Sequence, residues 1–262
     1  GTRYKTAYVI IEHQTFNLLN YSEFKRERVK TALLNATKVA AVSNHQKRCL
    51  LMSNINRKID IVWNLADEDV FLLRKEYQID RFIITTVTYG NRIKDPETFF
   101  QSVAKFIELN GIEDVEVIVV INYSDKLNIS NDNYFENLSE KYKLKGVCSF
   151  IVCKDKTELI RILQKSDVFI STSIAETFGL VVREAMLCGT PVISTKSGGV
   201  EDSLNQNTGV LVNIGDYEAI ATALLKIKHK EIILDTNYVR KFIIAQSGKK
   251  AFLKSMQDFY AF

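Results

Sequence analysis

Proline and glycine are scarce in this sequence, and no long apolar run occurs. Two prolines and 11 glycines in 262 residues exclude collagen-like and linker-rich, low-complexity architectures. No segment approaches the roughly 18 apolar residues that a membrane-spanning helix needs, and the polar residues 1–5 predict no signal peptide. Since 46% of the residues are hydrophobic and 25% are charged, we expect an ordinary globular protein, located in the cytoplasm.

Paired cysteines and metal-binding clusters are also missing. The four cysteines are scattered and form no Cys-x-x-Cys pair, which favours free, buried thiols in a reducing compartment over disulfides; they are Cys49, Cys148, Cys153 and Cys188. No group of histidine, cysteine and aspartate has the spacing of a metal site, so we expect neither a metal nor a cofactor. No nucleophile elbow is present, which argues against serine hydrolase chemistry.

The net charge of +4 is distributed unevenly. Residues 1–60 contain 11 lysines and arginines against 4 acidic residues, whereas the rest of the chain contains 24 against 27. The basic first part indicates either an anionic surface or ligand, such as the face of a membrane, or a solvated basic helix around residues 25–30. Because no recognised nucleic-acid-binding module accompanies it, we expect no nucleic-acid partner.

Short apolar strands alternate with helices along the chain. This alternation, with many strands apolar on both faces, predicts an α/β protein with a doubly wound, Rossmann-like parallel sheet. The predicted strands are 7–11, 39–42, 59–62, 82–87, 115–121, 147–152, 168–171, 191–194 and 209–212. The predicted helices are 22–35, 43–52, 98–110, 135–142, 156–165, 179–188, 198–204 and 217–228.

The last third of the chain contains the densest group of candidate site residues. Glu176 lies in the loop after a predicted strand, and Gly179 opens a predicted helix that contains Glu184. Ligands of such sheets bind at the carboxyl ends of the strands, where the backbone N–H groups of Thr177, Phe178 and Gly179 would favour a phosphate. Two carboxylates on either side of a diphosphate could each bind a polyhydroxy group.

Taken alone, Glu184 is more simply a surface residue paired with Arg183, but its surroundings change that interpretation. Residues 176–195 read ETFGLVVREAMLCGTPVIST, and SGGVED follows at 197–202. This order resembles the signature of retaining glycosyltransferases of the GT-B fold, family 4 type, with two glutamates separated by seven residues, Glu-Ala-Met, Gly-x-Pro-Val and a Gly-Gly turn. Four further segments match in the same order: IIEHQTF at 10–16, KVAAVS at 38–43, VWN at 62–64 and NTGVLV at 207–212.

The resemblance implies roles for individual side chains. Glu184 would bind the ribose of the donor nucleotide, and Glu176 would bind the donor sugar. Lys94 would neutralise the departing diphosphate. Arg92 would assist from a shifted loop, because no arginine occupies the family's usual place five or six positions before the lysine.

Other groups would complete the donor site in the same comparison. The backbone of residues 177–179 and of the pair Gly198 and Gly199 would cradle phosphate and sugar. His13, after the strand predicted at 7–11, would face the donor. Cys153 would contact the nucleotide base through its backbone, with an ordinary surface loop as the equal alternative.

The resemblance covers nearly the whole chain and implies three parts. Residues 1–66 would be the remnant of an N-terminal acceptor domain, a partial second α/β domain. Residues 67–240 would bind the nucleotide sugar. Residues 241–262 would form C-terminal helices that cross back to the first part. The expected interface residues are Phe242, Phe252, Phe259, Tyr260 and Phe262.

The implied activity is transfer of a sugar from a nucleotide sugar to a sugar or lipid-linked acceptor, with retention, in glycan or polysaccharide biosynthesis and without a metal. Because only twelve residues precede His13, the alternative is a non-catalytic donor-binding subunit that needs a separate acceptor-domain chain. A sugar epimerase of the same fold is a third hypothesis, but it would need additional acidic residues that the sequence does not locate.

Overall fold

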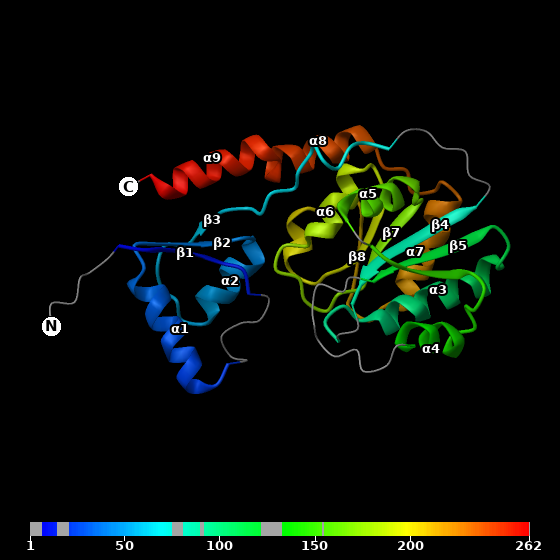
Figure 1. The fold of residues 1–262 in the computed structure, drawn as a ribbon, viewed down its shortest axis with the longest axis horizontal. Coiled ribbons are helices and arrows are strands. Elements are labelled where there is room, and N and C mark those ends of the chain that lie inside the picture. The colour runs from blue at the N-terminus through cyan, green and yellow to red at the C-terminus, as the bar shows by residue number, and fades with distance from the viewer. Residues whose placement is uncertain are drawn as a thin grey trace.

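Two separate parallel β-sheets organise the chain (Figure 1). The computed structural model describes residues 7–14, 21–74, 81–89, 92–121, 133–153 and 155–261. In these residues the first sheet has the strand order β1-β2-β3 and the second has the order β6-β5-β4-β7-β8-β9, with parallel pairing throughout. The strands are β1 (Val9–Glu12), β2 (Lys38–Ala41), β3 (Asp60–Ile61), β4 (Phe82–Thr88), β5 (Val115–Ile121), β6 (Cys148–Val152), β7 (Val168–Ser171), β8 (Val192–Thr195) and β9 (Val210–Val212).

Helices α1 (Glu23–Asn35) and α2 (Asn44–Met52) connect the strands of the first sheet. Ser43 begins α2 because its hydroxyl oxygen accepts a hydrogen bond from the N–H of Gln46 at 3.0 Å. A side-chain oxygen at this position satisfies one of the N–H groups that the first turn of a helix leaves without a partner. The helix start expected from the sequence at this serine is therefore confirmed.

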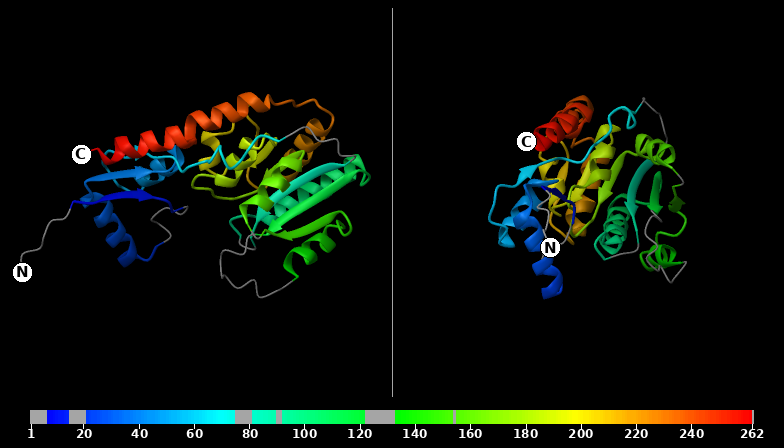
Figure 2. Two further views of the ribbon diagram at one scale, coloured as in Figure 1. Left: turned by 45° about the horizontal axis from the view of Figure 1, so that its top comes forward. Right: turned by 60° about the vertical axis from the view of Figure 1, so that its left-hand side comes forward.

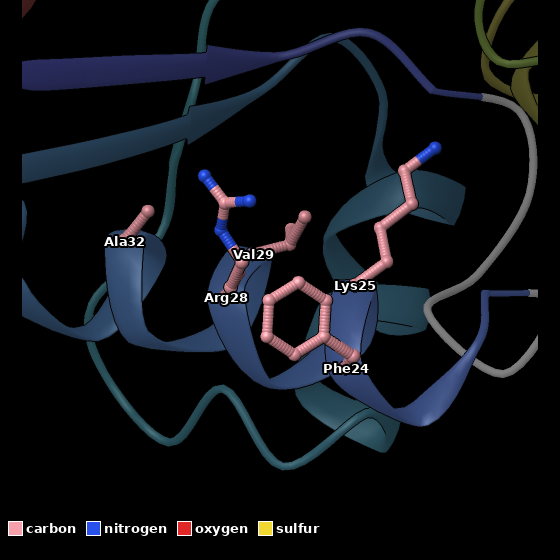
Figure 3. Close-up of a pocket in the computed structure, with 5 residues that line it drawn as sticks. All are labelled: Phe24, Lys25, Arg28, Val29 and Ala32. Carbon is pink, nitrogen blue, oxygen red and sulfur yellow. The ribbon is translucent and has the colours of Figure 1, made fainter.

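One side of α1 carries basic and apolar side chains around an open groove (Figure 3). Phe24 is 74% exposed, and the guanidinium carbon of Arg28 lies 5.6 Å from the centre of its ring. The groove is lined by Phe24, Lys25, Arg28, Val29 and Ala32. In the described part of the chain, no helix has the length and apolar character needed to cross a membrane.

The second sheet changes its direction of growth between β4 and β7. The chain adds β5 and β6 on one side of β4 and then returns to place β7 on the other side. Helices cover both faces of this sheet, one face around Phe99 and Leu224 and the other around Met186 and Ile243. The predicted doubly wound α/β fold is confirmed. Its helices are α3 (Pro96–Asn110), α4 (Tyr134–Lys141), α5 (Lys156–Lys165), α6 (Leu180–Leu187), α7 (Tyr217–Lys228), α8 (Thr236–Ser247) and α9 (Lys249–Tyr260).

The last two helices run end to end from the second sheet to the first (Figures 1 and 2). At the far end of α9, Phe259 packs with Ala40 and Val62, and Lys38 Nζ donates a hydrogen bond to the carbonyl of Phe259 at 3.0 Å. Phe242 was expected at the same interface, but it packs with the second sheet's core because it lies on α8. The boundary expected at residue 240 falls inside α8.

The helix predicted for residues 198–204 is wrong. The structure has only the short 3-10 turn η2 (Gly199–Asp202). Gly198 adopts φ +110°, which no helix uses, and the Thr208 hydroxyl donates to the carbonyl of Ser203 at 2.9 Å. The chain therefore turns away toward β9 after this short turn and does not continue as an α-helix.

Candidate functional site

The loops that follow β4 and β7 meet where the second sheet changes direction. Lys94, after β4, donates a hydrogen bond through Nζ to Oε1 of Glu176, after β7, at 2.5 Å. Both side chains are only 16% exposed, and the Ser173 hydroxyl donates to the same carboxylate oxygen at 2.7 Å. Burial alone would lower the pKa of Lys94, but the carboxylate of Glu176 and the phenol of Tyr89 outweigh it and raise that pKa. Lys94 is therefore charged at neutral pH.

Backbone contacts hold these two loops as one unit. The hydroxyl of Thr172 donates to the carbonyls of Lys94 and Asp95, at 3.0 and 2.8 Å. The N–H of Ile174 donates to the carbonyl of Ile93 at 2.7 Å. These three bonds place Lys94 opposite Glu176 without any contribution from the ion pair itself. The sequence reasoning missed Thr172 and Ser173, because side-chain to loop contacts leave no periodic pattern.

The loop of Glu176 is also bonded to the turn after β8. The N–H of Glu176 donates to the carbonyl of Ser197 at 2.7 Å, and the N–H of Gly199 donates to the carbonyl of Glu176 at 2.8 Å. A Cβ atom at Gly199 would overlap the carbonyl of Thr177, and one at Gly198 would lie 2.6 Å from the ring of His45. Both positions of the Gly-Gly turn therefore require glycine, because neighbouring atoms fill the space of a side chain.

Helix α6 buries the second glutamate of the motif. Gly179 precedes the helix in the left-handed conformation, at φ +74°. Glu184 is 5% exposed, and in the described residues its carboxylate has no hydrogen-bond or ion-pair partner. Burial raises its pKa to about 7, although Lys156 lowers it in part. The simple interpretation of Glu184 as a surface residue paired with Arg183 is wrong, and its carboxylate is available to hydrogen-bond donors of a ligand.

Arg183, the neighbour of Glu184, is fully buried. Its guanidinium donates to the carbonyls of Phe178 and Gly199 and to the side-chain oxygen of Gln246. Burial lowers its pKa to about 9, although the carboxylates of Asp202 and Glu176 favour the charged form. The sequence reasoning missed this residue, although one signal was present: an arginine inside an otherwise apolar helical turn.

The remaining predicted site residues take no part in the ion pair. Arg92 is exposed, and its guanidinium makes no hydrogen bond or ion pair with the described residues. Cys153 follows β6, which β5 and β4 separate from β7, and it packs on an apolar cluster. His13 follows β1 in the first sheet and is exposed. Positions 15–16 of the matched segment 10–16 lie outside the described residues.

The expectations about cysteines and metals concern the whole chain. All four cysteines are free thiols, but only Cys188 is buried. Its burial raises its pKa to about 12, so the thiol is protonated. No group of three or more histidine, cysteine or acidic side chains that could hold a metal ion occurs in the part of the chain that the structure describes.

A doubly wound parallel sheet with polar loops at its switch point, beside a second parallel sheet, is the architecture of GT-B glycosyltransferases. Sucrose-phosphate synthase from Thermosynechococcus elongatus has the same fold, with a TM-score of 0.83 at 22% identity over 96% of this chain and 66% of that chain. HepE of Anabaena, solved with UDP-glucose, gives a TM-score of 0.81 at 15% identity over 98% of this chain and 72% of that chain.

The chain belongs to the family described as glycosyl transferases group 1, whose model matches residues 72–245. D-inositol 3-phosphate glycosyltransferase from Corynebacterium urealyticum is 31% identical over 134 residues, which is 51% of this chain and 31% of that protein. N-acetyl-alpha-D-glucosaminyl L-malate synthase from Bacillus anthracis is 27% identical over 182 residues, which is 67% of this chain and 46% of that protein. The matched part of this chain thus spans less than half the length of these curated relatives.

Proposed function

We propose that this chain carries the donor site of a glycosyltransferase that moves a sugar from a nucleotide sugar to an acceptor, with retention at the anomeric carbon. One arrangement carries the proposal: Lys94 and Glu176 meet at the switch point, beside the start of the helix that buries Glu184. The ammonium of Lys94 matches the diphosphate of such a donor, and the carboxylate of Glu176 beside it matches the sugar. The carboxylate of Glu184, which has no partner among the described residues, matches the ribose.

In this proposal Glu184 accepts hydrogen bonds from the ribose hydroxyls. Its carboxylate is 5% exposed and has no protein partner in the described residues, so two ribose hydroxyls would supply the hydrogen bonds that the buried group lacks. Glu176, with one oxygen already bonded to Lys94 and Ser173, would accept from the sugar hydroxyls.

Lys94 would stabilise the charge that grows on the diphosphate as the glycosidic bond breaks. The transition state would be oxocarbenium-like, and charge stabilisation of the leaving group is usually the largest catalytic contribution. Arg92, exposed on the same loop, would add a second cation. Phosphate and sugar would be cradled by the backbone of residues 177–179 and of the pair Gly198 and Gly199. Their positions, at the start of α6 and in the turn bonded to it, support this role.

Two further roles follow from the same proposal. His13, after β1, would face the donor from the first sheet, and Cys153, after β6, would contact the nucleotide base. The acceptor would be a sugar or a lipid-linked sugar, in glycan or polysaccharide synthesis without a bound metal. Lys25 and Arg28 beside the exposed Phe24 support contact with an anionic membrane face. Sedimentation with vesicles of anionic and neutral lipids tests this contact.

Calorimetry with UDP-, GDP- and ADP-linked hexoses tests the donor site. We expect one of these nucleotide sugars to bind the wild-type protein and Glu184→Ala to abolish that binding with an unchanged circular dichroism spectrum. Glu218→Ala is the matched control, because Glu218 is an exposed glutamate at the start of α7. Unchanged affinity in the Glu184 variant would reject the proposed ribose contact.

A second candidate is a donor-binding subunit that needs a separate acceptor-domain chain. The matched part of this chain spans 31% and 46% of the two curated relatives. Sugar transfer assayed with this chain alone, and then with proteins encoded beside it, separates the two functions. Donor binding without transfer by the isolated chain supports the subunit, whereas transfer by the isolated chain rejects it.

A further inference from the structure

The buried guanidinium of Arg183 joins two loops of the donor site. It donates to the carbonyl of Phe178, in the loop of Glu176, and to the carbonyl of Gly199, after β8, at 3.3 Å for the second bond. The guanidinium carbon also lies 3.7 Å from the centre of the Phe178 ring. One side chain therefore contacts both backbone segments, the loop and the turn, that hold Glu176 in place.

Gln246 and Asp202 connect the same guanidinium to α2, the helix between β2 and β3 of the first sheet. Arg183 donates to the side-chain oxygen of Gln246 on α8 at 3.3 Å, and the Gln246 amide donates to the carbonyl of Asp202 at 2.8 Å. The Asp202 carboxylate then accepts from the N–H and the side-chain amide of Asn44, at 2.9 and 3.1 Å. Asn44 is the first residue of α2, so a continuous polar chain links α2 to the loop of Glu176.

The contacts of Arg183 indicate that it holds two loops together. Arg183 has no carboxylate within ion-pair distance among the described residues, and its Nε is buried without a partner. An apolar side chain of similar volume would leave the carbonyls of Phe178 and Gly199 without this donor. What an apolar side chain cannot do is donate to two carbonyls at once, as the planar guanidinium does.

We propose that Arg183 is a positioning residue of the donor-sugar site, which holds the loop of Glu176 and the Gly198–Gly199 turn in one fixed arrangement and ties both to α2. The inference rests on the proposed function of Glu176, since Arg183 is fully buried and would act on the site only through these loops. Its loss would misplace Glu176 and the Gly198–Gly199 turn but leave Glu184 and the proposed ribose contact in place. A displacement of about 1 Å in a positioned group can lower a rate by about 100-fold.

The distinguishing experiment compares the nucleoside with the nucleotide sugar in Arg183→Met. We expect calorimetry to show nucleoside affinity within about twofold of wild type, and hydrolysis of the nucleotide sugar to fall about 10- to 100-fold in kcat. Arg183→Lys, which keeps the charge but not the planar fork, should recover little of this loss. An equal loss for both ligands, or no loss in kcat, overturns the proposal.

Arg240→Met is the matched control. Arg240 also donates to backbone carbonyls of the same domain, those of Glu68, Phe71 and Leu187, but it lies away from the loop of Glu176. This variant should lose stability without changing the ratio between the two ligands. A ratio changed equally in both arginine variants would show a general effect of destabilisation and reject a specific role for Arg183.

Hydrogen exchange tests the same proposal without any ligand. The N–H of Gly199 donates to the carbonyl of Glu176, so its exchange reports the loop contact directly. Arg183→Met should speed this exchange by about tenfold or more, and Arg240→Met should not. Gln246→Ala should act in the same direction, and the double variant should show less than the product of the two effects. Unchanged exchange at Gly199 refutes the positioning role, whereas a wild-type protein that binds no nucleotide sugar refutes the proposed function instead.

Discussion

Lys94 and Glu176 form a half-buried ion pair, 2.5 Å from Nζ to Oε1, although 82 positions separate them in the chain. The pair exists because the carboxyl ends of β4 and β7 are adjacent at the switch point of the sheet. In a donor complex the same ammonium would face a diphosphate, so it would serve two anionic groups at once. This double role leads to separate expectations for ligand affinity and for stability.

Lys94→Met should weaken binding of a nucleoside diphosphate more than binding of the nucleoside. A hydrogen bond to a charged group contributes about 1.5 to 3 kcal/mol, which corresponds to roughly 10- to 100-fold in affinity. Calorimetry with both ligands measures the difference. Lys105→Met is the control, because Lys105 pairs with Glu108 on the exposed side of α3. Equal losses for nucleoside and diphosphate would reject the phosphate role of Lys94.

The stability of the pair follows from its burial. Lys94→Met leaves the carboxylate of Glu176 with only the Ser173 hydroxyl as a partner among the described residues, at a cost of about 3 kcal/mol in the free energy of unfolding. Lys94→Met combined with Glu176→Gln removes the uncompensated charge, so the double variant should be more stable than the single one. Urea denaturation of the four proteins in the cycle measures the coupling. If the two losses simply add, the pair is not coupled.

The family resemblance placed Lys94 and Glu176 in one donor site, but their direct ion pair was not predicted, because no sequence pattern shows which strand ends are adjacent. The burial of Glu184 did not follow from its pattern alone, since helical periodicity does not tell which neighbouring element covers a face. The roles of Arg183 and Thr172 could not be predicted either, because their acceptors are backbone carbonyls of distant loops. The turn at 199–202 was mistaken for a helix because the conformation of Gly198 depends on the contacts around it.

Glu184 should make the stability of the free protein depend on pH. Its pKa is raised to about 7, chiefly by burial, above the usual value of 4.5. Between these two values the folded state holds a proton that the unfolded state has lost, so the free energy of unfolding should fall as pH rises from about 4.5 to about 7. The full effect is on the order of 3 kcal/mol. Urea denaturation across this range should show the fall in wild type and not in Glu184→Gln. The same dependence of the free energy of unfolding on pH in both proteins would contradict the assignment of the raised pKa to Glu184.

The same residue should make nucleotide binding depend on pH in the opposite direction. Ribose hydroxyls bond the ionised carboxylate more strongly than the protonated form, so affinity should increase as pH rises toward and through about 7. Calorimetry in buffers with different ionisation enthalpies should detect release of a proton on binding at pH 6. Glu184→Gln should remove this proton release. A wild-type protein that takes up a proton on binding would exclude the proposed ribose contact.

The contact between Gly198 and His45 joins the second sheet to α2, and it can be tested with a matched glycine. Gly198→Ala places a Cβ 2.6 Å from the His45 ring at φ +110°, whereas Gly146→Ala has a similar φ of +94° with no atom within 4 Å. Gly146→Ala therefore measures backbone strain alone, on the order of 1 to 3 kcal/mol. Gly198→Ala should cost more, and His45→Ala in the same chain should recover the excess but not the strain. Equal losses in the two glycine variants, measured by urea denaturation, would show that His45 does not press against this turn in solution.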